Sequence, residues 1–291
     1  MIVFQLLEEG LLNIDTPFLE LLSDTVTKKF LSNFLHHQGI NCAPRITVKN
    51  LLNHSSGCAD YFADDATFLK NILSNPHQKW NWKKIMEHYY ASQLHKSILF
   101  IPAKGFHYSD TNYLLLALLI EGIMGCSFHE VLDSRIIKEV SLKDTFLEFY
   151  ENKKGNNTIQ YPYFGEQSLK DVNTSFDWGG GGLVSTATDL DLFLRALFSG
   201  KLFQNSETLN AMFEYNDHSL AKNSRIAYGL GIQKKEILGQ TLYGHNSAYG
   251  GMAFYIVERD TSIIINLNQA HAPHKAELLL KKIIAQFTSK N

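Results

Sequence analysis

Three short polar segments, residues 51–57, 105–113 and 244–251, hold most of the groups in this chain that could do chemistry. A serine, a histidine and an aspartate that meet in space can form a hydrolase site, in which the histidine activates the serine hydroxyl. His245 is a candidate for such a set. The sequence has no Gly-x-Ser-x-Gly nucleophile elbow, which weakens this hypothesis without excluding it, because such sites are defined by geometry.

Each segment also has a structural explanation when it is taken alone. A tyrosine at a helix entrance, such as Tyr108, is usually a packed aromatic with a satisfied hydroxyl group. His54 and Ser55 can cap and close a helix end. The glycine run at residues 179–182 lacks the Lys-Ser/Thr of a phosphate-binding loop. It therefore predicts backbone that bends tightly or passes close to another segment.

The sequence gives no sign of a metal or a cofactor. No group of His, Cys, Asp or Glu has the spacing of metal ligands, so we predict neither. The three cysteines, Cys42, Cys58 and Cys126, are far apart and form no Cys-x-x-Cys pair. This pattern supports neither a disulfide framework nor a zinc ribbon.

The composition is that of an ordinary folded protein. The 291 residues carry 27 basic and 29 acidic side chains, and 45% of them are hydrophobic. A net charge of −2 excludes a general electrostatic binder of nucleic acid and disfavours a polybasic membrane-surface protein. The most apolar stretch, residues 113–124, is shorter than the roughly 20 residues of a membrane span. We expect no transmembrane segment, and one large domain or two closely packed ones.

Helices are expected where apolar periodicity follows a capping residue. The chain starts as the last turns of a helix that Gly10 ends, without the features of a signal peptide. Further helices are expected from Thr47 to Leu52, from Thr186 to Gly200, and at 276–287. A helix at 111–124 would have Asp110 as its N-cap and would end at Gly125. Residues 72–94 are expected to form helical pieces, broken at Pro76.

Four apolar segments late in the chain are expected to be strands: 227–232, 236–243, 251–257 and 262–268. The short turn-like pieces between them predict an antiparallel meander. Helices first, then a sheet, then a final helix predict an α+β chain, or an α/β sheet unit with a helical unit beside it.

In their order along the chain, four motifs resemble those of the serine β-lactamase-like superfamily, on the branch of class C β-lactamases, D-alanyl-D-alanine carboxypeptidases and related esterases. Its LLTHTSG is similar to residues 51–57, its Tyr-x-Asn element to 108–113, its GGLVSTAxDL to 181–190, and its Lys-Thr-Gly or His-x-Gly element to 245–247. The resemblance covers nearly the whole chain.

The resemblance implies a β-lactamase/transpeptidase-like fold, with an antiparallel sheet flanked by helices and a helical subdomain. Residues 1–50 and 185–291 would form a discontinuous α/β subdomain. Residues 51–184 would form the mainly helical subdomain of one compact unit.

The resemblance also implies acyl transfer through a serine ester, with the nucleophile in a Ser-x-x-Lys helix. Tyr108 would be the acid/base partner, although a tyrosine pKa of about 10 needs nearby cations to favour the phenolate. Asp110 takes the position usually held by asparagine, where it would orient the substrate or the lysine. An ionised carboxylate there can only accept hydrogen bonds.

By the same resemblance, the strand motif at residues 245–247 would face the substrate. His245 would supply its polar or cationic group, and Asn246 and Ser247 would contact the substrate. Ser247 stands where glycine is more typical, so its side chain would narrow the space beside the oxyanion.

The nucleophile itself is expected outside these residues. In the family, the Ser-x-x-Lys helix continues directly into a segment like residues 5–10, about four to five helical turns before Gly10. The resemblance therefore implies a serine upstream of Met1 and no activity in the chain as written.

Two other matches to the nucleophile pattern carry less weight. Residues 219–222 read Ser-Leu-Ala-Lys but follow the tyrosine motif in a polar stretch, which favours a surface loop. Residues 25–28 read Thr-Val-Thr-Lys but follow Gly10, and there a helix entrance is favoured.

The expected function is that of a serine hydrolase or acyltransferase whose partner is a small molecule or peptide: a β-lactam, a D-Ala-D-Ala-like peptide or a small ester. The departures at Asp110 and Ser247 leave an alternative open, a non-catalytic binding or scaffold protein on the same fold. The sequence indicates neither the localisation nor the oligomeric state.

Overall fold

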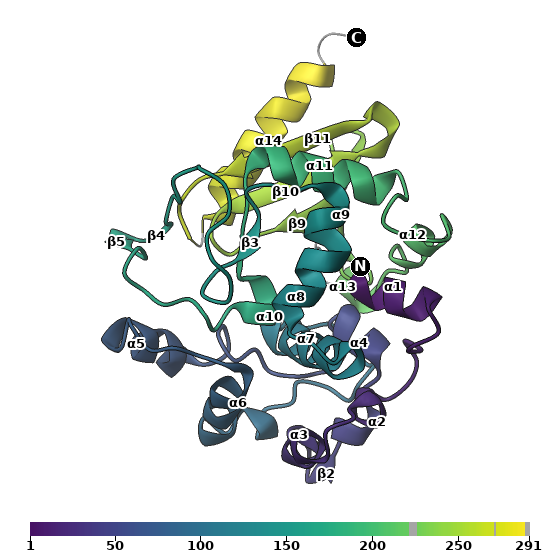
Figure 1. Cartoon of the computed structure of the whole chain (residues 1–291), viewed down its shortest axis with the longest axis vertical. Coiled ribbons are helices and arrows are strands. Elements are labelled where there is room, and N and C mark those ends of the chain that lie inside the picture. The colour runs from purple at the N-terminus through teal and green to yellow at the C-terminus, as the bar shows by residue number, and fades with distance from the viewer. Residues whose placement is uncertain (221–225, 271, 289–291) are drawn as a thin grey trace.

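The late apolar segments form a five-stranded antiparallel sheet, and most of the earlier helices pack on one side of it (Figure 1). The computed structural model describes residues 1–220, 226–270 and 272–288. The strand order is β11-β10-β9-β8-β7. The strands are β7 (Ile226–Tyr228), β8 (Gln233–Ile237), β9 (Gln240–Asn246), β10 (Gly251–Ile256) and β11 (Thr261–Asn266). The predicted meander is confirmed.

Two of the predicted strands were wrong in their boundaries, because each contains a turn. Leu238 and Gly239 both have positive φ, 50° and 74°, which is the backbone of a tight hairpin between β8 and β9. The predicted strand 236–243 therefore covers the end of one strand and the start of the next. β7 ends at Tyr228, and Gly231 with φ 86° turns the chain toward β8.

The helices are α1 (Ile2–Glu8), α2 (Phe18–Leu21), α3 (Thr25–Leu31), α4 (Val48–Leu52), α5 (Ala66–Ser74), α6 (Trp82–Ala91), α7 (Asp110–Met124), α8 (Phe128–Leu132), α9 (Lys138–Val140), α10 (Trp178–Gly181), α11 (Ala187–Phe198), α12 (Thr208–Ala211), α13 (Asp217–Leu220) and α14 (Pro273–Thr288). Single turns are η1 (Ala43–Arg45), η2 (Leu94–Lys96), η3 (Asp133–Ile137) and η4 (Val257–Arg259). Short strand pairs are β1 (His36–His37) with β2 (Ile40–Asn41), β3 (Phe146–Leu147) with β6 (Leu183–Val184), and β4 (Tyr163–Phe164) with β5 (Gln167–Ser168).

Helix α7 is the centre of the helical layer, and most of its residues are buried. Its predicted end at Gly125 is confirmed, with φ 67°. Its predicted N-cap was wrong by one residue: Ser109 is the N-cap and Asp110 is the first helical residue. The Asp110 amide instead donates to Oδ2 of Asp60 at 2.5 Å, so a carboxylate from another segment caps this helix.

The glycine run packs against α7, which is one of the two outcomes that the sequence predicted, a close approach to another segment. A Cβ atom added at Gly179 would lie 2.5 Å from Cβ of Ala117 and 2.7 Å from the carbonyl oxygen of Tyr113. Only glycine allows α10 to approach α7 this closely.

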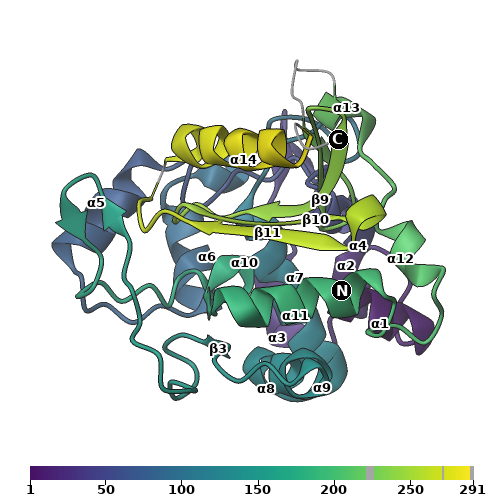
Figure 2. The same ribbon diagram turned by 90° about the horizontal axis from the view of Figure 1, so that it is seen from above.

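Helices cover both faces of the sheet (Figure 2). Helix α14 packs on one face, where Leu280 and Ile284 meet Leu242, Phe254 and Ile263 in an apolar cluster. Helix α11 packs on the other face, toward the helical layer. Its predicted start is confirmed, since the Thr186 hydroxyl accepts from the Asp189 amide.

Helix α2 packs against α7 and so lies with the helical layer; the division of the chain at residues 50 and 184 stays a prediction. In the described ranges, no single helix is long and apolar enough to cross a membrane. Two consecutive helical segments, Asp110–Met124 and Phe128–Val140, are together long and apolar enough by length and composition alone, but the chain bends by 81° between them.

Candidate active site

The three polar segments meet at one end of the sheet. The rings of His54 and Tyr108 lie 4.2 Å apart, and those of Tyr108 and His245 lie 6.0 Å apart. Tyr228 from β7 closes the group, with its ring 4.7 Å from that of His54. The structure thus brings together Tyr108 and His245, two of the predicted catalytic residues.

His54 joins the first two segments. It is fully buried with φ 56°, a backbone conformation that residues other than glycine rarely adopt. Its Nδ1 accepts from the Ser109 amide and the Asn112 side-chain amide, each at 3.1 Å, so the ring is neutral with its proton on Nε2. Burial, together with the nearby His245 and His107, holds the pKa of His54 well below its usual range.

Tyr108 is 39% exposed, and its hydroxyl is hydrogen-bonded to Asp110. Partial burial, followed by the charges of Asp110 and Asp60, raises the pKa of Tyr108 well above its usual range. The phenol is therefore protonated at neutral pH and can donate a proton. It could accept one only if a cation were brought beside it.

Asp110 differs from the simple carboxylate that the sequence suggested. Burial, followed by the charges of Asp60 and Asp177, raises its pKa well above the usual range. A protonated Asp110 can donate as well as accept hydrogen bonds, as the asparagine of the family motif does. The hydrogen bonding of Asp110 can therefore be closer to that of asparagine than the change of residue type suggests.

The His245 ring has two hydrogen-bond partners. Its Nδ1 lies 2.6 Å from the carbonyl oxygen of Asn246, and its Nε2 lies 3.0 Å from the Tyr228 hydroxyl. Burial lowers the pKa of His245. In the described part of the chain, no hydrogen bond or ion pair joins this ring to a serine or a carboxylate, which gives the Ser–His–Asp hypothesis no support.

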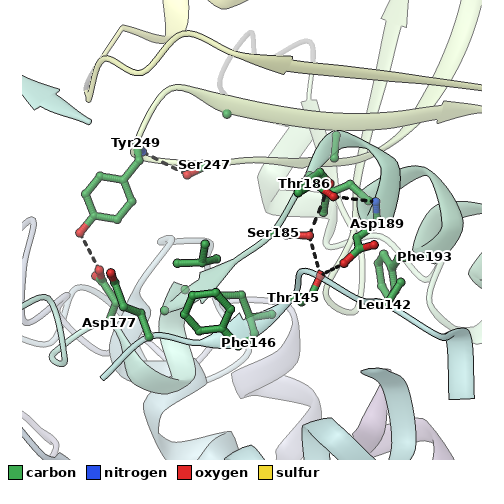
Figure 3. A pocket seen from close by; sticks show the side chains of 18 of the residues that line it. Leu142, Thr145, Phe146, Asp177, Ser185, Thr186, Asp189, Phe193, Ser247 and Tyr249 are labelled. Atoms are coloured by element: carbon green, nitrogen blue, oxygen red, sulfur yellow. Dashed lines mark hydrogen bonds between the residues drawn. The ribbon is translucent and has the colours of Figure 1, made fainter. Parts of the chain in front are cut away.

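The other two residues of the strand motif have structural partners. The Asn246 side chain accepts at 3.1 Å from Nζ of Lys235, a buried lysine on the α14 side of the sheet that also contacts Glu277. The Ser247 hydroxyl accepts from the Tyr249 amide at 3.1 Å, within the β9–β10 turn (Figure 3). Their roles in substrate binding stay predictions.

A cavity of about 910 Å³ lies between the helical layer and the sheet. Its apolar lining comes from both layers and from the first residues of α1: Met1, Ile2, Leu116, Ala117, Ile120, Phe128, Leu132, Phe193, Met252 and Ile264. His245, Ser247, Tyr249 and Asp177 also line this cavity.

The motif at residues 181–190 supports one wall of the cavity. The Asp189 carboxylate accepts from the Thr145 hydroxyl at 2.7 Å (Figure 3). It also accepts from the Asp144 amide at 2.8 Å. The Ser185 hydroxyl lies 2.8 Å from that of Thr145. These contacts join the start of α11 to the segment that leads into β3.

Sequence reasoning missed Tyr228, Asp177 and Tyr249 as members of the site. Tyr228 was noted only as part of a strand, and Asp177 only precedes the glycine run. The Tyr249 hydroxyl donates to Oδ2 of Asp177 at 2.5 Å (Figure 3). Nothing in their spacing pairs these two residues, because 72 positions separate them.

Neither alternative nucleophile is free at this site. Ser219 lies in α13 and is buried, so the surface-loop interpretation was wrong for it. Its hydroxyl donates to the Asn216 carbonyl at 2.6 Å and accepts from the Tyr228 amide at 3.0 Å; Lys222 lies outside the described residues. Thr25 is the first residue of α3, capped by Asp24, which confirms the helix entrance.

The described residues contain no group of three or more His, Cys, Asp or Glu side chains placed to hold a metal ion.

Comparisons with known proteins identify a family for this chain. A family model described as Beta-lactamase matches residues 1–286. Penicillin-binding protein 4* of Bacillus subtilis is 24% identical over 260 residues, which are 80% of this chain and 54% of that protein. The putative fimbrial assembly protein FimD of Dichelobacter nodosus is 27% identical over 294 residues, covering 96% of this chain and 65% of that protein. The chain thus spans about half to two thirds of the length of these relatives.

Solved structures show the same fold. A D-stereospecific amidohydrolase from Streptomyces sp. has a TM-score of 0.77 at 26% identity, covering 94% of this chain and 81% of that chain. A D-amino acid amidase from Ochrobactrum anthropi SV3 has a TM-score of 0.72 at 21% identity, covering 98% and 81%. The family model matches nearly the whole chain, so the chain belongs to the beta-lactamase family. Its fold is β-lactamase/transpeptidase-like.

Proposed function

We propose that this site performs acyl transfer through a serine ester, on a β-lactam, a D-Ala-D-Ala-like peptide, or a small ester or amide. Amides are among the proposed substrates because two of the similar structures are described as an amidohydrolase and an amidase. In this proposal, Tyr108 transfers the proton, Asp110 orients the reacting groups, and the strand at residues 245–247 faces the substrate.

The cavity between the two layers is the observation that carries the proposal. It begins at the first residues of α1 and reaches His245 and Ser247. A helix that continues α1 upstream of Met1 would fill it and could carry the Ser-x-x-Lys pair toward Tyr108. The lysine would supply the cation that the Tyr108 phenol needs in order to act as a base.

Labelling with a fluorescent penicillin and with p-nitrophenyl acetate tests this proposal. The 291-residue chain is expected to form no acyl-enzyme. The same chain preceded by a helix that carries Ser-x-x-Lys is expected to be labelled on the serine of that helix. If that longer chain binds acyl compounds but is never acylated, the non-catalytic alternative replaces this proposal.

A further inference from the structure

His54 holds the residues on both sides of Tyr108. The His54 carbonyl oxygen accepts from the His107 amide at 3.0 Å, and Nδ1 of its ring accepts from the Ser109 amide at 3.1 Å. The ring itself packs on the phenol, with the two ring centres 4.2 Å apart and the planes tilted by 32°. One residue therefore contacts the residue before Tyr108, the residue after it, and the face of its ring.

The donors of these hydrogen bonds fix their direction. A backbone amide can only donate, so the Ser109 amide makes Nδ1 of His54 an acceptor. Asn112 must then present its side-chain NH₂ group to the same nitrogen, at 3.1 Å, and its Oδ1 accepts from the Ser56 hydroxyl at 2.6 Å. A proton on Nδ1 would break both bonds to the ring. The hydrogen bonds therefore place the proton of the His54 ring on Nε2.

The backbone of His54 is strained in this arrangement. Its φ of 56° lies in the left-handed region, which side chains other than glycine rarely adopt. Such strain persists where the surroundings hold it in place, and it gathers at functional sites. The side chain is also fully buried. A strained backbone and a buried polar ring both have a reason if the ring holds Tyr108.

Further hydrogen bonds tie the segment after Tyr108 to the segment after His54. The hydroxyls of Ser109 and Thr111 donate to the carbonyl oxygen of Ala59, at 3.1 and 2.8 Å. The backbone on which Tyr108 is mounted is thus held by buried contacts, whereas the Tyr108 side chain stays 39% exposed. This combination keeps the phenol accessible at a defined place.

We infer that His54 is a positioning residue for proton transfer by Tyr108. This rests on the proposed function and deepens it. A group that transfers a proton must lie within hydrogen-bond reach of the reacting atoms, and a displacement of about 1 Å can cost about 100-fold in rate. Because His54 is buried and acts through Tyr108, its loss slows acylation and leaves substrate binding unchanged.

The contacts of His54 can be measured by NMR without any acylation. In the ¹⁵N-labelled chain of residues 1–291 at pH 7, the Ser109 amide nitrogen is expected to show a scalar coupling to Nδ1 of His54, because this coupling passes through an N–H···N hydrogen bond. The His54 ring is expected to carry its proton on Nε2, and its ring protons are expected to show cross-relaxation with those of Tyr108. A proton on Nδ1, or the absence of the coupling, overturns the inference whether or not any variant folds.

Two substitutions of His54 give the second readout, in the chain preceded by a helix that carries Ser-x-x-Lys. Glycine takes positive φ without strain but offers no acceptor, whereas Oδ1 of an asparagine takes the place of Nδ1 and accepts from the same amide. His54→Gly is expected to slow acylation by p-nitrophenyl acetate at least about ten-fold, with KM within about three-fold of the unmodified value. His54→Asn is expected to react at least about three-fold faster than His54→Gly.

Two controls separate positioning from a general loss of stability. His107→Gln changes the neighbouring side chain, which contacts Asp64 at 2.7 Å, and keeps the amide that His54 binds. Ile263→Val loosens the apolar cluster under α14, on the far face of the sheet. Both are expected to acylate within about two-fold of the unmodified rate.

An undiminished rate in His54→Gly overturns the inference, and so does an equal loss in Ile263→Val. A rise in KM that accounts for the whole effect would assign His54 to substrate binding and also overturns it. If the unmodified extended chain never acylates, the proposed function falls, and the coupling between Ser109 and His54 still shows whether His54 holds the segment that carries Tyr108.

Discussion

The Tyr249 hydroxyl donates a 2.5 Å hydrogen bond to the Asp177 carboxylate, and this contact ties the β9–β10 turn to the start of α10 (Figure 3). It joins the sheet to the helical layer at the rim of the cavity. Burial is the main cause that raises the pKa of Asp177 to about 7, and the charge of Glu148 adds to it, while the bond from Tyr249 opposes the rise.

This raised pKa predicts how stability depends on pH. Asp177 in the folded protein keeps its proton up to about pH 7, whereas the ordinary value is 3.8. Between these values the folded state binds more protons, so the contribution of Asp177 to the free energy of unfolding falls as the pH rises. Asp177→Asn removes this penalty and is expected to raise the free energy of unfolding at pH 8, by at most roughly 4 kcal/mol, and to change it little near pH 4.

Urea unfolding at pH 4, 6 and 8 measures this difference. The control is Asp171→Asn, because Asp171 is exposed on the segment that leads to α10. An effect of Asp177→Asn that stays the same at all three pH values would show that the carboxyl does not titrate as described.

The glycine run gives a matched pair of substitutions. At Gly179 an added methyl group meets Ala117 at 2.5 Å, whereas at Gly181 it meets nothing within 4 Å. Gly179→Ala is expected to lower the free energy of unfolding by about 1–3 kcal/mol, because α10 must move away from α7. Gly181→Ala is expected to be within about 1 kcal/mol of the unmodified chain. Chemical denaturation compares the two, and equal losses would contradict the packing described here.

His54 tests the link between the first two polar segments. Asparagine tolerates positive φ and can accept from the Ser109 amide, whereas valine does neither. His54→Asn is therefore expected to unfold at a higher temperature than His54→Val, by a difference of roughly 1–3 kcal/mol in the free energy of unfolding. Thermal unfolding followed by circular dichroism decides this, and a valine variant as stable as the asparagine variant would count against the proposed role of the ring.

A part of this fold can be predicted from the sequence when neighbouring residues along the chain determine it. The C-terminal end of α7, the start of α11 and the meander are encoded by caps, turns and apolar periodicity, and these were predicted. For the glycine run, the sequence predicted only a tight bend or a close approach to another segment. The hairpin at Leu238 and Gly239 was hidden inside an apolar run, because leucine seldom adopts positive φ.

The site was predictable only in part, for the same reason. The motifs that carry Tyr108, Asp110 and His245 are short and are recognised in sequence. Their contacts come from distant positions: Tyr228 contacts His245, and Asp60 contacts Asp110. Tyr249 and Asp177 are likewise far apart in the sequence. Burial and tertiary contacts bring these pairs together, so the spacing of residues along the sequence does not reveal them.

Tyr108 carries the proton transfer in the proposed function. In the chain extended upstream of Met1, Tyr108→Phe is expected to slow acylation by p-nitrophenyl acetate by about 10²–10⁴-fold, with the free energy of unfolding little changed, because Tyr108 is 39% exposed. Tyr163→Phe is the control, since Tyr163 is also exposed, at 43%, and lies in β4, outside the three polar segments. Stopped-flow kinetics measures the rates, and an undiminished rate in Tyr108→Phe would remove this residue from the mechanism.

The most direct test of the central claim is the mass of the protein after reaction with an acyl donor, followed by peptide mapping. The account predicts that residues 1–291 alone gain no acyl group, whereas a chain in which a Ser-x-x-Lys helix precedes Met1 gains one, on the serine of that helix. One stoichiometric acyl group on any serine within residues 1–291 would contradict it.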